Sequence, residues 1–165
     1  MRGVLEGGML REHTFDTGVV AINYAEGPHS GMPLVLLHGG AGSWRQFLAA
    51  IPNLIPNWHV YAPDFRGHGR SGRVPGAYRW MDFVQDTTAF LRHQFSEPVI
   101  LWGSSFGGTV ALGVAAQAAD TVRALVLLDP WLELRTSKDE TRQFLRYRRD
   151  LVVSVRSLDK MITAL

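Results

Sequence analysis

The 165-residue sequence contains no cysteine. This absence excludes disulfide bonds, thiolate nucleophiles and cysteine-based metal sites. No run of about 18 consecutive apolar residues occurs, as a membrane-spanning helix would require, and residues 1–8 lack the apolar segment of a signal peptide. We therefore expect a cytoplasmic protein with no membrane partner.

Lysine is also scarce, with only Lys138 and Lys160, and the net charge is only +2. Such a small excess does not favour a nucleic-acid partner. Arginines gather at residues 142–149 with helical spacing, which indicates a solvent-exposed helix face or, as an alternative, an anion or partner site. Hydrophobic residues make up 46% of the chain and charged residues 19%, so we expect one globular domain.

Short apolar runs alternate with helix-like stretches along the chain. The first two runs predict a hairpin that turns at Thr17-Gly18, and the later runs are typical of strands buried on both faces. The predicted strands are residues 12–16, 19–25, 34–37, 60–62, 99–102 and 124–128, and the predicted helices are residues 43–51, 79–95 and 106–119. This alternation predicts an α/β fold with a mostly parallel, doubly wound sheet.

Two serines stand inside a glycine cluster that follows the apolar run at residues 99–102. The sequence fits G-x-S-x-G in one register only, with Gly103 and Gly107 flanking Ser105. A serine on a sharp strand-to-helix turn exposes its hydroxyl group, and the crowded turn requires small residues two positions away on either side. A serine between glycines is usually a simple turn, but the buried strand before it and the Gly/Ala-rich helix after it favour a nucleophile at Ser105.

Two further glycine-rich segments follow predicted strands. The loop at residues 38–42 has unencumbered backbone N–H groups that could face a substrate or cradle a phosphate, but the lysine of a Walker loop is missing. Residues 67–72 match G-x-G-x-x-G, yet Val74-Pro75-Gly76 stands where a helix should begin. A dinucleotide site is therefore disfavoured, and we expect no cofactor and no metal.

Together, these segments resemble the α/β-hydrolase superfamily: His38-Gly39-Gly40, the stretch DFRGHGRSG at residues 64–72, and the G-x-S-x-G turn. The resemblance covers residues 10–131. It implies a serine hydrolase that acts on a small ester, lactone or related acyl substrate. It also implies Ser105 as the nucleophile and an oxyanion hole formed by the backbone N–H groups of Gly40 and Phe106.

The resemblance assigns loop-shaping roles, not catalytic ones, to His38, His68 and Asp64. Ser104 replaces the histidine often found beside the nucleophile, which leaves the subfamily open among esterase, lactonase, peptidase, thioesterase, C–C hydrolase and cofactor-free haloperoxidase. An aspartate nucleophile would indicate dehalogenase or epoxide chemistry, and Ser105 disfavours both.

No histidine follows Ser105, because the last one is His93. Family members carry the triad acid and then the histidine base after the nucleophile. Asp129, at the end of the sixth predicted strand, is a candidate acid or a structural residue. We expect the base to come from a C-terminal portion of the same fold, in a longer parent or a second polypeptide.

The predicted sheet is truncated after its sixth strand, which leaves residues 124–128 as an apolar edge that could pair with a second copy in a homodimer. Residues 1–130 would then be the N-terminal part of the hydrolase core, and residues 131–165 the start of a helical cap. The alternative is a non-catalytic relative, or an isolated folding fragment, that serves for binding or assembly.

Overall fold

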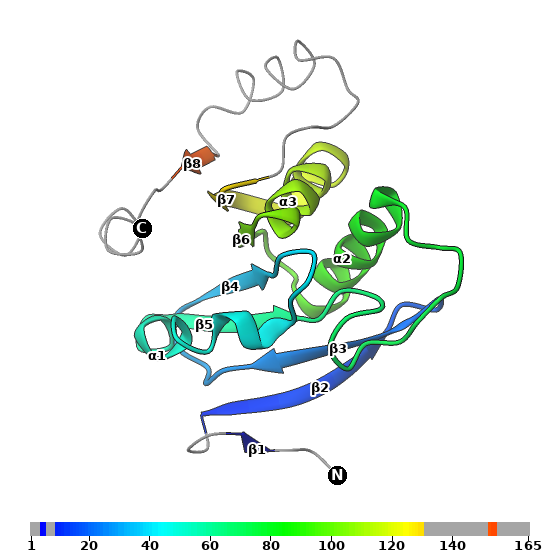
Figure 1. Cartoon of the computed structure of the whole chain (residues 1–165). Coiled ribbons are helices and arrows are strands. Elements are labelled where there is room, and N and C mark those ends of the chain that lie inside the picture. The colour runs from blue at the N-terminus through cyan, green and yellow to red at the C-terminus, as the bar shows by residue number, and fades with distance from the viewer. Residues whose placement is uncertain (1–3, 6–8, 131–151, 155–165) are drawn as a thin grey trace.

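The structure is a computed structural model that describes residues 4–5, 9–130 and 152–154. Within these ranges one sheet has the strand order β1-β2-β3-β5-β4-β6-β7-β8 (Figure 1). The strands β4 to β8 pair in parallel, whereas β1, β2 and β3 form an antiparallel extension that joins the sheet through β3 and β5. The predicted mostly parallel α/β sheet is confirmed.

The strands are β1 (Val4–Leu5), β2 (Leu10–Asp16), β3 (Ala21–Glu26), β4 (Met32–Leu37), β5 (Trp58–Pro63), β6 (Val99–Ser104), β7 (Val122–Leu128) and β8 (Val152–Ser154). The predicted hairpin is present as β2 and β3, which turn at Gly18 with φ +85°. The buried centre of the sheet consists of apolar residues on both faces, as in β4, where Leu34, Val35, Leu36 and Leu37 are fully buried. Such strands require cover on each side.

Helices supply that cover on both faces of the sheet (Figure 1). On one face, α2 (Trp80–Gln94) and α3 (Phe106–Gln117) pack over a core that includes Leu37, Leu101 and Val110. On the other face, the 3-10 helix η1 (Trp44–Phe47) and α1 (Ile51–Leu54) cover a second core that includes Trp44 and Trp102. A further 3-10 turn, η2 (Ala119–Thr121), leads into β7.

Two expectations from the sequence are corrected. The helix predicted over residues 43–51 is a short 3-10 helix capped by the Ser43 side chain, followed by α1 with Pro52 in its first turn. A proline fits there because the first-turn N–H has no partner within the helix.

The other correction concerns the edge of the sheet. We expected β7 to form an unpaired edge, but β8 pairs in parallel with it from Leu125 to Leu127. The β-branched Val152 and Val153 favour a strand. Apart from β8, the predicted cap at residues 131–165 and the arginine-rich stretch at 142–149 lie outside the described residues.

Among the helices that the structure describes, none is both long enough and apolar enough to cross a bilayer.

Candidate functional site

Ser105 occupies the turn between β6 and α3, and its backbone is held in an unusual conformation. Its dihedral angles are φ 50° and ψ −118°, a region that side-chain-bearing residues rarely adopt and that costs about 1–3 kcal/mol. The Ser105 N–H donates to the carbonyl oxygen of Leu128, 2.8 Å away at the end of β7. The side chain is exposed and does not cap α3. The fold therefore presents the predicted nucleophile to solvent on a strained turn.

The two flanking glycines are required by contacts on either side of Ser105. A Cβ on Gly103 would lie 2.5 Å from the Gly107 carbonyl oxygen, and a Cβ on Gly107 would lie 2.1 Å from the carbonyl oxygen of Leu37. Both distances are far below van der Waals contact. Only glycine lets α3 start this close to β4 and β6, which is the physical basis of the G-x-S-x-G spacing.

The predicted oxyanion-hole residues, Gly40 and Phe106, lie next to one another. A Cβ on Gly40 would be 3.6 Å from the Cβ of Phe106. In the described part of the chain, the backbone N–H groups of both residues have no hydrogen-bond acceptor. In contrast, the N–H of the preceding Gly39 donates to Gln46 Oε1, 3.0 Å away. The N–H groups of Gly40 and Phe106 are thus both available as donors and lie side by side.

Gln46, which the sequence analysis did not single out, links the two loops. Besides accepting from Gly39, its side-chain amide donates to Ser104 Oγ at 3.1 Å. It lies in η1, within residues 43–51, which the sequence predicted only as a helix, and no sequence motif includes it. Gln46, Ser104, Ser105 and the 39–43 loop line a wide, open depression of about 660 Å³.

His38 is buried beneath this loop and both of its ring nitrogens are engaged. Its Nδ1 lies 2.7 Å from the Gly39 carbonyl oxygen, and its Nε2 accepts from the Phe65 N–H at 2.9 Å. This pattern requires a neutral ring with the proton on Nδ1. Burial lowers the pKa of His38 to about 4. The residue has no free nitrogen with which to deprotonate Ser105.

His68 lies beside the same loop, and each ring nitrogen faces a backbone carbonyl oxygen. Nδ1 lies 2.9 Å from the oxygen of Arg66, and Nε2 lies 2.7 Å from the oxygen of Gly40. The ring stands 5.3 Å from that of His38. His68 therefore connects the 64–72 loop to the glycine loop.

The Asp64 carboxylate accepts hydrogen bonds from three residues in different parts of the chain. Its Oδ1 accepts from the Trp44 N–H at 2.7 Å, and its Oδ2 accepts from Asn23 Nδ2 at 2.9 Å and from the Arg70 N–H at 3.0 Å. Gly69 has φ +49°, and a Cβ there would lie 2.1 Å from Asp64 Oδ2. The loop-holding role expected for Asp64 agrees with these contacts.

A buried ion pair anchors the 64–72 loop to α2. The Arg66 guanidinium contacts both carboxylate oxygens of Asp86, with Nε to Oδ2 at 2.6 Å and Nη2 to Oδ1 at 2.7 Å. A third bond runs from Arg66 Nη1 to the carbonyl oxygen of Ala77. Hydrogen bonding to Asp86 raises the pKa of Arg66. The loop is therefore fixed to α2 by a buried ion pair.

Asp129, the candidate acid, follows β7 directly and is exposed, with φ 47°. It is adjacent in sequence to Leu128, whose carbonyl oxygen accepts from Ser105. No histidine in the described residues is hydrogen-bonded to either Ser105 or Asp129. The exposed Ser105 hydroxyl group thus lies beside two acceptor-free backbone N–H groups, whereas no histidine of the described residues is bonded to it.

Comparison with known proteins identifies the family. A family model described as "alpha/beta hydrolase fold" matches residues 32–162. The chain belongs to the alpha/beta hydrolase fold family. This match runs through all three glycine-containing segments described above, and the strained turn at Ser105 agrees with the nucleophile position of such folds.

Several relatives of the chain are named as lipases, esterases or other hydrolases. It is 39% identical over 114 residues to the lipase LipV of Mycobacterium tuberculosis, covering 68% of this chain and 42% of that protein. It is 36% identical over 100 residues to a soluble epoxide hydrolase of a Corynebacterium species, covering 61% and 35%. Among solved structures, a putative lipase from Acinetobacter baumannii superposes with TM-score 0.70 at 26% identity, covering 83% and 48%. The chain spans less than half the length of each relative.

Proposed function

We propose that the protein is a serine hydrolase that acts on carboxylic esters or related acyl compounds through Ser105. The observation that carries the proposal is the exposed, strained Ser105 at the N-terminus of α3, beside the acceptor-free N–H groups of Gly40 and Phe106. Acyl transfer needs a nucleophilic hydroxyl group next to donors that stabilise the oxyanion.

In the proposed reaction, Ser105 Oγ attacks the acyl carbonyl carbon and its proton passes to a base. The carbonyl oxygen becomes an oxyanion that accepts hydrogen bonds from the two N–H groups, aided by the positive end of the α3 dipole. The tetrahedral intermediate then expels the alkoxide, which takes up the proton as an alcohol. Water releases the acyl group from Ser105 as a carboxylic acid by the same steps.

The base is proposed to come from outside the 165 residues, because no histidine follows Ser105 and no histidine of the described residues is hydrogen-bonded to it. A second polypeptide or a longer form of the chain could supply it, as in the chain order of the family. Asp129 is proposed as the acid that would orient that base, since it stands at the end of β7 beside the turn.

The second candidate function is binding or assembly without catalysis. It is favoured by the lack of a histidine hydrogen-bonded to Ser105 in the described residues. Epoxide or haloalkane hydrolysis, named for several relatives, is not proposed for this chain because the nucleophile position holds serine rather than aspartate.

The test uses the full chain, p-nitrophenyl acetate and added imidazole as a substitute base. Without the base, the oxyanion donors should still accelerate ester hydrolysis by about 10³–10⁴ over water, and imidazole should raise the Ser105-dependent rate. The Ser105→Ala variant should keep the contribution of the oxyanion donors but lose the increase with imidazole, and Ser104→Ala, the matched control, should retain that increase. Equal rates in wild type and Ser105→Ala in the presence of imidazole would favour the non-catalytic alternative.

A further inference from the structure

A cluster of histidines surrounds Glu26 at the end of the sheet away from Ser105. The strand register places Arg11 on β2 and Tyr61 on β5 opposite Glu26, and His13 on β2 opposite Tyr24. Side chains alternate between faces along a strand, so His13, Glu26 and His59 share one face. His59 is the second residue of β5 and lies at the amino end of the parallel strands. Ser105, in contrast, follows the carboxyl end of β6. The cluster is therefore separate from the hydrolase site.

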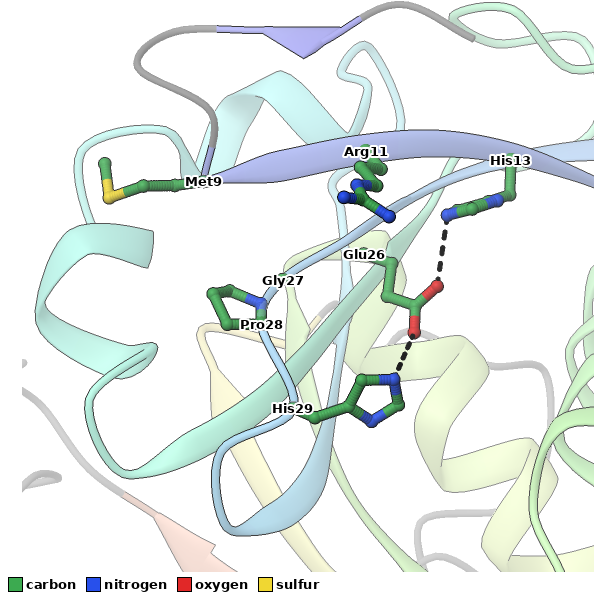
Figure 2. Close-up of a pocket in the computed structure, with 7 residues that line it drawn as sticks. All are labelled: Met9, Arg11, His13, Glu26, Gly27, Pro28 and His29. Carbon is green, nitrogen blue, oxygen red and sulfur yellow. Dashed lines mark ion pairs between the residues drawn. The ribbon is translucent and has the colours of Figure 1, made fainter.

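Glu26 is the centre of this cluster, and three imidazole rings converge on its two oxygens. His59 Nε2 lies 3.0 Å from Oε1, and His29 Nε2 lies 4.0 Å from the same oxygen. His13 Nε2 lies 3.1 Å from Oε2. Figure 2 shows the rings of His13 and His29 directed at opposite oxygens of the carboxylate.

We propose that Glu26, His29 and His59 bind a divalent transition-metal cation of the class that prefers imidazole, represented by Zn²⁺. One ligand atom from each of these residues lies within 4.8 Å of the others, from two strands and a loop. Two imidazole nitrogens and one carboxylate oxygen form a donor set typical of Zn²⁺, whereas Ca²⁺ and Mg²⁺ prefer oxygen ligands. Nothing in the hydrolase site depends on this cation.

His59 has the surroundings of a preorganised ligand. Its side chain is almost entirely buried, and its Nδ1 lies 3.4 Å from the hydroxyl group of Tyr61. With the metal on Nε2, the proton moves to Nδ1 and is donated to the Tyr61 oxygen, the kind of outer contact that fixes a metal-bound imidazole.

His29 supplies the adjustable part of the site. Its side chain is 86% exposed, and its ring centre lies 4.1 Å from that of His59. It can therefore shift toward the carboxylate without disturbing the core. Glu26, His29 and His13 line a cavity of about 440 Å³, which leaves room for water as a fourth ligand.

Two neighbours outside the proposed ligand set act on Glu26. His13 stacks on Tyr24, with ring centres 5.3 Å apart, and its bond to Oε2 leaves Oε1 facing His29 and His59. Arg11 lines the same cavity and adds positive charge, but it is exposed, so its long side chain can turn toward solvent when a cation binds. His13 is thus a positioning residue, and Arg11 tunes the affinity.

The experiment is a calorimetric titration of the full chain with Zn²⁺ alone. We expect one equivalent to bind with a Kd of about 1 µM or tighter. The His29→Ala variant should bind at least about tenfold more weakly, because it removes a ligand without opening the core. His93→Ala is the matched control: this exposed histidine stacks on Phe15 and lies outside the cluster, so binding should be unchanged.

A second readout excludes binding elsewhere on the surface. In ¹H–¹⁵N spectra of the imidazole groups, Zn²⁺ should shift the nitrogen signals of His29 and His59 and leave those of His38 and His93 in place. The proposal is overturned if Zn²⁺ binds more weakly than about 1 µM, if His29→Ala binds as tightly as wild type, or if the signals of His29 and His59 do not move.

Discussion

The Nε2 atom of His68 lies 2.7 Å from the carbonyl oxygen of Gly40, while Nδ1 of the same ring lies 2.9 Å from the carbonyl oxygen of Arg66. Both contacts join the His68 ring to backbone carbonyl oxygens, one in its own loop and one in the glycine loop. Since Arg66 is anchored to Asp86 on α2, a rigid chain of contacts runs from α2 to the glycine loop. His68 thereby positions Gly40, the proposed oxyanion donor.

Replacing His68 should impair catalysis more than stability. His68→Ala removes the bond to the Gly40 carbonyl oxygen, and a displaced donor can cost up to about 10²-fold in rate. We expect the Ser105-dependent kcat for p-nitrophenyl acetate in the presence of imidazole to fall, with KM nearly unchanged. The control is His93→Ala, which should keep the wild-type kcat. A kcat that is equal in the two variants would show that His68 has no positioning role.

The glycine at position 107 should be irreplaceable for folding. Gly107→Ala would bring a Cβ to within 2.1 Å of the Leu37 carbonyl oxygen, and overpacking of this severity should destabilise the fold by more than about 3 kcal/mol. At Gly40, the added Cβ would make ordinary contact at 3.6 Å with Phe106, so Gly40→Ala should cost less than about 1 kcal/mol. Urea unfolding followed by circular dichroism compares the two. Similar midpoints would contradict the close approach of α3 to β4.

The buried pair of Arg66 and Asp86 should matter far more than the surface pair of Arg92 and Asp120. Asp86→Ala would leave a buried guanidinium without its partner, at a cost of about 3–5 kcal/mol. Asp120→Ala breaks an exposed contact of 3.6 Å and should change the free energy of unfolding by less than about 1 kcal/mol. Chemical denaturation of both variants measures the difference. Equal losses would mean that the loop is not anchored through Asp86.

The protein should lose stability in mild acid through His38. Burial lowers the pKa of His38 from 6.5 to about 4 in the folded state, so the unfolded state binds more protons between these values. The contribution of the neutral His38 ring to the free energy of unfolding is fully present above pH 6.5. It declines by about 3 kcal/mol in total as the pH falls toward 4. In His38→Gln the free energy of unfolding should depend less on pH over this window. An unchanged dependence would contradict the buried, neutral ring.

Local patterns in the sequence predicted the sharp strand-to-helix turn at Ser105. The clash distances at Gly103 and Gly107 explain why, since a backbone this crowded permits only glycine and therefore leaves a visible spacing. The free N–H groups of Gly40 and Phe106 were predicted for a similar reason, because a glycine-rich loop and the start of a helix can both be recognised from a few consecutive residues.

Contacts between distant segments were not predictable in this way. Gln46 donates to Ser104, 58 positions later in the chain, and His59 contacts Glu26, 33 positions earlier. No local spacing in the sequence reveals either contact. The broken helix at residues 43–51 and the three-residue β8 were missed because short elements depend on their neighbours more than on their own pattern.

The most direct test of the account is to map where an acyl-directed probe attaches. The full chain is treated with a fluorophosphonate in the presence of imidazole, digested and analysed by mass spectrometry. We predict a single adduct on Ser105 in wild type and in Ser104→Ala, and none in Ser105→Ala. An adduct that persists in Ser105→Ala, or no adduct in the wild type, would contradict the assignment of Ser105 as the nucleophile of a serine hydrolase.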